Sequence, residues 1–101
     1  MARWSTHRTD GNADALRTYL EAHGAQVHVI DRPLDWLVSG WGVTAIAEVK
    51  RAKQPLRASQ EAFLARYAGL WAILTTERDC DALLGVLRRL AASTRLESVS
   101  R

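Results

Sequence analysis

The chain has 101 residues, of which 48% are apolar and 25% charged, and its formal net charge is +3. This length suits one domain with one core, and the apolar content argues against a disordered chain. No apolar run approaches the ~18 residues of a membrane span, and no signal-peptide core follows Met1, so we expect an intracellular, cytoplasmic protein. Cys80 is the only cysteine, which leaves neither a disulfide framework nor a cysteine zinc site.

The first half of the chain predicts one helix followed by three strands. Asp10 and Asn12 are good N-cap residues, apolar residues then recur at helical spacing, and Gly24 is a natural stop. Val27 and Val29 then alternate with Gln26, His28 and Ile30, which is typical of a strand, and Pro33 interrupts this pattern. The expected strands cover residues 26–30, 35–39 and 44–50, and Gly40-Trp41-Gly42 supplies the turn between the last two.

The second half predicts a helix, a strand and a final helix. The order α-β-β-β-α-β-α indicates an α/β domain with a mixed sheet and helices packed on its faces. We expect one domain over residues 1–101, with a core of about 8–92. The expected parts are a basic loop at 51–57, a helix at 59–68 stopped by Gly69, a strand at 70–75, a helix opened by a Thr76/Asp79 capping box, and a basic tail at 93–101.

Two carboxylates and a lysine gather at one end of this sheet. If the hairpin turn is centred on Trp41-Gly42, Asp35 lies directly opposite Glu48. Their Cβ atoms would then be about 4.5–5.5 Å apart, where like charges repel. Lys50 shares the face of Glu48, because side chains alternate with period two. Two interpretations stay open: a salt-bridge cluster neutralised by Lys50, or a site for a hard cation such as Mg²⁺.

The residues around this cluster resemble a known nuclease signature. Pro33-Leu34-Asp35, followed by Glu48-Val49-Lys50 on the next strand, is similar to the PD-(D/E)XK motif, with one residue inserted between the proline and the aspartate. The longer pattern resembles the VRR-NUC-like branch of that superfamily, especially small phage-type endonucleases. The further matching pieces are Asp10-Gly11-Asn12, Gly24 and Leu56-Arg57-Ala58-Ser59-Gln60, all within residues 8–84.

This resemblance implies a restriction-endonuclease-like αβββαβ core, to which the chain adds a C-terminal helix. It implies an endonuclease that uses Mg²⁺ or Mn²⁺ to hydrolyse DNA phosphodiester bonds. Asp35, Glu48 and the backbone carbonyl of Val49 would hold the metal. Lys50 would assist the attacking water, and Gln60 would reach from its helix to place the lysine or the scissile phosphate.

The first helix departs from the family pattern. Many relatives carry a glutamate there near the metal, whereas the nearest acids in this chain are Asp10 and Asp14, with Asn12 between them. The contribution of these three residues to the site therefore stays open.

Basic residues near the cluster are the expected contacts to DNA phosphates, which position a protein without reading bases. The alternative is that they form an ordinary solvated face. The expected contacts are Arg8, Arg51, Lys53 and Arg57.

The size of the domain bears on its substrate, because little room remains for a separate recognition domain. We expect a homodimer that acts on branched DNA such as a Holliday junction, where two sites can meet one substrate. A phage-encoded enzyme of this type would act in the host cytoplasm. The alternative function is a catalytically silent DNA-binding or assembly module of the same fold.

The four tryptophans divide into two pairs. Trp36 and Trp71 lie in expected strands and are expected in the core. Trp4 and Trp41 are harder to bury in one small core, so they are candidates for an interface or for stacking on bases.

Overall fold

The computed structural model describes residues 4–99, and within that range the side chains of residues 12–93. Its sheet has the strand order β1-β2-β3-β4. The first three strands are antiparallel neighbours, and β4 lies parallel to β3. The predicted α/β class, mixed sheet and element order are therefore confirmed. The elements are α1 (Trp4–Ala22), β1 (Gln26–Val29), β2 (Trp36–Gly40), β3 (Val43–Val49), α2 (Ala58–Arg66), β4 (Trp71–Leu74) and α3 (Glu77–Val99).

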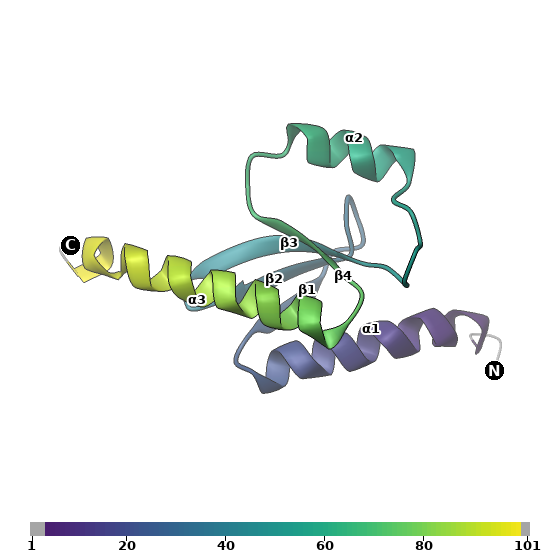
Figure 1. Cartoon of the computed structure of the whole chain (residues 1–101), viewed down its shortest axis with the longest axis horizontal. Helices are drawn as coiled ribbons and strands as arrows, with labels where there is room; N and C mark the ends of the chain where they lie inside the picture. The colour runs from purple at the N-terminus through teal and green to yellow at the C-terminus, as the bar shows by residue number, and fades with distance from the viewer. Residues whose placement is uncertain (1–3, 100–101) are drawn as a thin grey trace.

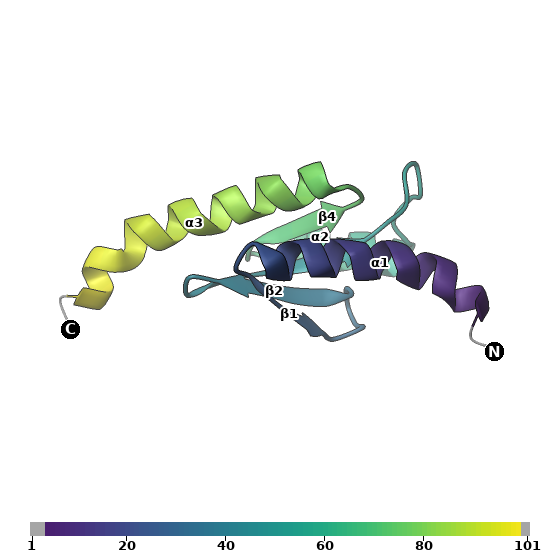
Figure 2. The ribbon, with the colours of Figure 1, turned by 90° about the horizontal axis from the view of Figure 1, so that it is seen from below.

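Two helices cover one face of the sheet, and the third lies against the other face. In Figure 1, α3 passes in front of the strands, α1 lies below them and α2 lies above them. In the view from below in Figure 2, α1 passes in front of the strands and α3 runs along their upper side. The main core forms between the sheet and the α1–α3 pair, because their apolar side chains meet there. Its fully buried side chains include Leu20, Val38, Leu74, Leu84 and Leu87.

The β2–β3 hairpin has the register that the sequence predicts. Trp41 and Gly42 have φ angles of 56° and 82°, as a two-residue turn of type I′ requires. Leu37 therefore pairs with Ile46, and the ladder continues in that register. All four strands lie within one residue of their expected ends. This register determines which side chains meet at the end of the sheet.

The start of α1 differs from the prediction. The helix begins at Trp4, so Asp10 and Asn12 lie inside it and do not cap it. No proline precedes them to stop the helix, and a side chain that favours an N-cap is also tolerated within a helix at modest cost. The preference of aspartate and asparagine for N-cap positions was therefore weak evidence for where this helix begins.

The end of α1 follows the prediction. Gly24 has a φ of 102°, a left-handed conformation that glycine adopts without strain. Its N–H donates to the carbonyl of Glu21 at 3.2 Å. The N–H of Ala25 donates to the carbonyl of Leu20 at 3.1 Å, which completes a Schellman motif.

The end of α2 differs from the prediction, because Gly69 does not stop this helix. The last helical residue is Arg66, and Tyr67 is already extended with a ψ of 126°. A Cβ placed on Gly69 would lie only 2.6 Å from the Tyr67 hydroxyl oxygen. Glycine at this position therefore leaves room for the tyrosine ring.

The start of α3 is capped as predicted. Asp79 Oδ2 accepts the N–H groups of Thr75 and Thr76, and Thr76 Oγ1 accepts the N–H of Asp79 at 3.3 Å. The helix then continues to Val99, through residues that the sequence suggested as part of a tail. No helix in residues 4–99 is both long enough and apolar enough to cross a membrane.

The tryptophans do not all lie where the sequence places them. Trp36 is buried in the core as predicted, but the prediction for Trp71 is wrong, since 48% of this residue is exposed. Trp71 pairs with Ile46 on the edge strand β4, on the sheet face away from α1 and α3. Trp41 is also exposed, and the guanidinium of Arg88 lies 4.8 Å from the centre of its ring.

Candidate functional site

Asp35 and Glu48 meet where the β2–β3 ladder ends. The N–H of Asp35 donates to Glu48 Oε1 at 3.1 Å. The carboxylate of Asp35 in turn accepts the N–H of Val49 through Oδ2 at 2.8 Å. The paired register stops at Trp36 and Ala47, and its continuation would place Val49 opposite Leu34. The side chain of Asp35 therefore accepts an N–H that the backbone carbonyl of Leu34 would accept in a longer ladder. Backbone hydrogen bonds thus hold two like charges side by side.

Glu48 has further partners on its second oxygen. Gln60 Nε2 donates to Glu48 Oε2 at 2.6 Å, and Lys50 Nζ lies 3.5 Å from the same oxygen. All three side chains are buried. The four residues that the sequence analysis proposed as catalytic are therefore brought together, and their roles stay predictions. We call Asp35, Glu48, Lys50 and Gln60 the carboxylate cluster.

Burial raises the pKa of Glu48, and the neighbouring charge of Asp35 raises it further. The hydrogen bond from Gln60 and the ammonium of Lys50 act in the opposite direction, but the net pKa remains above its ordinary value. With both carboxyl groups ionised, the cluster has one more negative charge than positive charge. An added cation would therefore stabilise its ionised form.

Gln60 connects the cluster to the start of α2. Its Oε1 accepts the N–H of Arg57 at 3.0 Å, while its Nε2 donates to Glu48. Both ends of the side-chain amide are therefore used. The segment that resembles the family motif, from Leu56 to Gln60, thus places α2 against the exposed end of the sheet.

The donor atoms suit a hard cation. Among the described side chains, no three His, Cys, Asp or Glu residues gather to bind a metal. Two carboxylates are available here, and Asp35 Oδ1 has no hydrogen-bond partner in the described part of the chain. The Val49 carbonyl lies on the same strand edge as its N–H, which faces Asp35. Two carboxylates, a carbonyl and waters form a set of oxygen donors that fits Mg²⁺ or Mn²⁺.

The residues proposed from the first helix do not join the cluster through any described contact. Asn12 is half-buried and Asp14 is exposed, and neither makes a hydrogen bond or ion pair with the cluster within the side chains described. The side chains of Trp4, Arg8 and Asp10 lie outside the described residues.

The proposed phosphate contacts lie near the cluster on exposed backbone. Arg51 and Lys53 belong to the loop between β3 and α2, and Arg57 immediately precedes α2. All three side chains are exposed to solvent. They can therefore meet a polyanion that approaches the cluster from this side.

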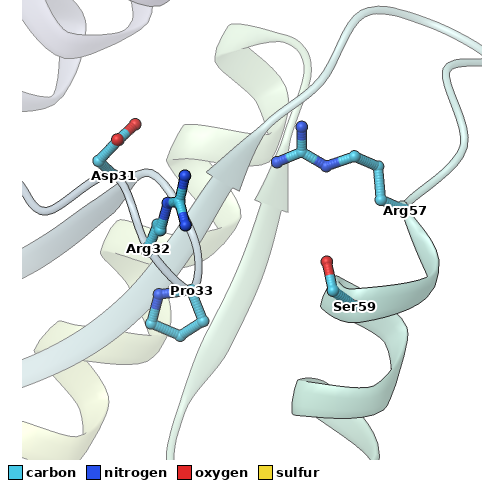
Figure 3. Close-up of a pocket in the computed structure, with 5 residues that line it drawn as sticks. All are labelled: Asp31, Arg32, Pro33, Arg57 and Ser59. Atoms are coloured by element: carbon cyan, nitrogen blue, oxygen red, sulfur yellow. The ribbon is translucent and has the colours of Figure 1, made fainter.

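A pocket of about 730 Å³ lies between the β1–β2 loop and the start of α2. Figure 3 shows Arg57 reaching from the start of α2 toward this loop, with Arg32 on the other side. We call it the two-arginine pocket. Its lining residues are Asp31, Arg32, Pro33, Arg57 and Ser59.

Arg32 and Ser59 line this pocket but were not predicted from the sequence as site residues. Ser59 stands within the quoted Leu56-to-Gln60 segment, so its position in the motif was a usable signal. No comparable pattern marks Arg32, because its proximity to α2 depends on how the loop before β2 folds. Comparison of the chain with protein-family models, with curated proteins and with solved structures gave no match.

Proposed function

We propose that this chain is a metal-dependent DNA endonuclease that resembles the PD-(D/E)XK superfamily and hydrolyses phosphodiester bonds. The observation that supports this most strongly is the pair of Asp35 and Glu48, held together by backbone N–H groups with Lys50 beside them. Placing a half-buried carboxylate beside the buried Glu48 is unfavourable without a compensating cation. The ammonium of Lys50 compensates only one of the two charges.

Each residue of the cluster has a definable role in this proposal. A Mg²⁺ or Mn²⁺ ion held by Asp35, Glu48 and the Val49 carbonyl would polarise the phosphoryl group and acidify a water molecule. Lys50 orients the attacking water or neutralises charge that develops on the phosphate. Gln60 holds Glu48 Oε2 through a short hydrogen bond, so it acts as a positioning residue.

The finer part of the proposal concerns the substrate and the assembly. We assign the enzyme to branched DNA, such as a four-way junction, and to a homodimer. The half-exposed Trp71 on the edge strand β4 supports the homodimer. An exposed strand edge with apolar side chains is a surface on which a second copy can pair. Light scattering should then give about twice the chain mass of 11.3 kDa.

A second function is favoured by one specific observation. Both oxygens of Glu48 already accept hydrogen bonds from the protein, and Lys50 lies beside it, as in a structural salt-bridge cluster. A catalytically silent DNA-binding or assembly module could use the cluster for stability alone. In that case the wild-type protein would not hydrolyse DNA, and removal of Glu48 would unfold the chain.

The test is cleavage of supercoiled plasmid and of a panel of junction, flap, splayed and linear DNA, in Mg²⁺, Mn²⁺ or EDTA. We expect cleavage with either cation, none in EDTA, and a preference for the junction. Glu48→Gln and Asp35→Asn should remove cleavage while the proteins stay folded. Glu61→Gln, which changes an exposed carboxylate on α2, is the matched control and should cleave normally. Equal cleavage in EDTA and Mg²⁺ would overturn the metal-dependent mechanism.

A further inference from the structure

The two-arginine pocket contains positive charge that no described side chain neutralises through an ion pair. Arg32 and Arg57 line it from separate segments, and neither makes an ion pair within the described side chains. Asp31 also lines the pocket, and it pairs with neither arginine. Figure 3 shows the guanidinium of Arg57 extending from the start of α2 toward the loop that carries Arg32. Guanidinium groups match the geometry of phosphate oxygens and bind them through two parallel hydrogen bonds.

The start of α2 adds donors to the same pocket. Ser59 lies in the first turn of this nine-residue helix and lines the pocket, and Figure 3 shows its hydroxyl oxygen on the side of Arg57. The N–H of Gln60 already donates to the carbonyl of Arg57 at 2.9 Å. The N–H groups of Ala58 and Ser59 precede the first hydrogen bond of the helix, and the helix dipole favours an anion there. The two arginines and this helix start therefore favour the same kind of ligand.

Both walls of the pocket are bonded to the carboxylate cluster. The N–H of Asp31 donates to the carbonyl of Asp35 at 3.0 Å, and the N–H of Arg57 donates to Gln60 Oε1 at 3.0 Å. An anion held between these walls would thus lie beside the proposed reaction site. A volume of about 730 Å³ is in the range of small-molecule sites and large enough for a nucleotide unit.

We infer that the two-arginine pocket binds a phosphate group of a nucleic-acid strand, next to the phosphate on which the carboxylate cluster would act. This inference rests on the proposed function. Arg32 and Arg57 bind the same phosphate group, and Ser59 donates to one of its oxygens. The pocket would hold the strand in register with Asp35 and Glu48, without reading its bases.

The test measures binding of a short fluorescent single strand by anisotropy, in EDTA so that no hydrolysis occurs. We expect Arg32→Gln/Arg57→Gln to weaken binding by about tenfold or more, because charge-assisted hydrogen bonds to the phosphate are lost. The slope of log affinity against log salt should fall by about 0.7, the share of one phosphate on a single strand. Arg89→Gln, an exposed arginine on α3, is the matched control and should retain the affinity of the wild-type protein.

Competition distinguishes a strand phosphate from a free one. Unlabelled strand should displace the probe at far lower concentration than thymidine monophosphate or inorganic phosphate, and a strand with uncharged methylphosphonate linkages should not displace it. Displacement by the mononucleotide at the same concentration as the strand would overturn the assignment to a strand. Unchanged affinity and salt slope in the folded double variant would overturn the pocket itself.

The two proposals can fail separately. Plasmid cleavage by the wild-type protein, together with unchanged strand binding by the double variant, would remove the pocket and leave the nuclease. Loss of binding in the double variant, together with no cleavage by the wild-type protein in any cation, would support the pocket and remove the nuclease.

Discussion

The side-chain amide of Gln60 donates to Glu48 Oε2 at 2.6 Å, across the interface between α2 and the sheet. Its other end accepts the N–H of Arg57, so one buried side chain joins the start of a helix to the carboxylate cluster. A displacement of α2 would therefore remove a donor from a carboxylate that burial already disfavours. The position of this helix and the ionisation of Glu48 are linked.

Truncation of this link should reduce stability. We expect Gln60→Ala to lower the free energy of unfolding by about 1–3 kcal/mol, because it removes the shorter of the two contacts to a buried oxygen of Glu48 and leaves only Lys50 at 3.5 Å. Urea denaturation monitored by circular dichroism measures this loss. Gln26→Ala, at an exposed position on β1, should change the stability by less than about 0.5 kcal/mol. Equal effects of the two substitutions would contradict the role of the Gln60 bond.

The raised pKa of Glu48 predicts how stability depends on pH. The folded protein holds this proton more tightly than the unfolded chain, whose glutamate titrates near 4.5. The stabilisation is therefore complete below that value and is lost as pH rises through the higher pKa of the folded state. Relative to Glu48→Gln, the wild-type protein should become less stable as pH increases from 4.5 upward.

Unfolding free energies measured across this pH range, without divalent cations, check that prediction. The exposed Glu61 provides the control, since Glu61→Gln should follow the wild-type curve. If the wild-type protein instead became more stable than Glu48→Gln as pH rises, the contacts of Glu48 with Lys50 and Gln60 would outweigh the effect of burial on its pKa.

The meeting of Asp35 and Glu48 was predictable from the sequence because it depends on only two local features, the turn of the hairpin and the alternation of side chains in each strand. A two-residue turn at Trp41-Gly42 sets the pairing, and the period of two in each strand then sets the faces. Asp35 must therefore meet Glu48. Gln60 comes from a separate helix, and only the resemblance to a nuclease motif connected it to them.

Features that depend on packing between distant segments were not predictable in the same way. The apolar pattern around Trp71 indicates a strand, but it does not say that this strand lies at the sheet edge with one face uncovered. Arg32 approaches the start of α2 only after the loop before β2 has folded. Gly69 resembles a helix stop, although it serves the close approach of the Tyr67 ring.

Two glycines should respond in opposite directions to alanine. Gly42 has a φ of 82° with open space around a Cβ, so Gly42→Ala should cost about 1 kcal/mol through backbone strain alone. Gly85 lies within α3 and also has space for a Cβ, so Gly85→Ala should stabilise the protein by about 0.5–1 kcal/mol. Thermal melts of both variants measure this contrast. A stabilising Gly42→Ala would contradict the type I′ turn.

Binding of a divalent cation should be detectable without any measurement of cleavage. A cation that binds the folded state raises its stability in proportion to the logarithm of cation concentration, once that concentration exceeds Kd. We therefore expect Mn²⁺ to raise the Tm of the wild-type protein progressively. Asp35→Asn keeps an oxygen that can accept the Val49 N–H but removes one negative charge, so it should abolish this rise.

The apo form of the same variant provides an independent check. Without cation, Asp35→Asn should be as stable as the wild-type protein or more stable by about 0.2–1 kcal/mol, because a like-charge repulsion with Glu48 is removed. Glu61→Gln should respond to Mn²⁺ as the wild-type protein does. An equal rise in Tm for wild type and Asp35→Asn would place the cation elsewhere. A strongly destabilised apo variant would instead favour a structural salt-bridge cluster, since Asp35 would then contribute through its charge to folding itself.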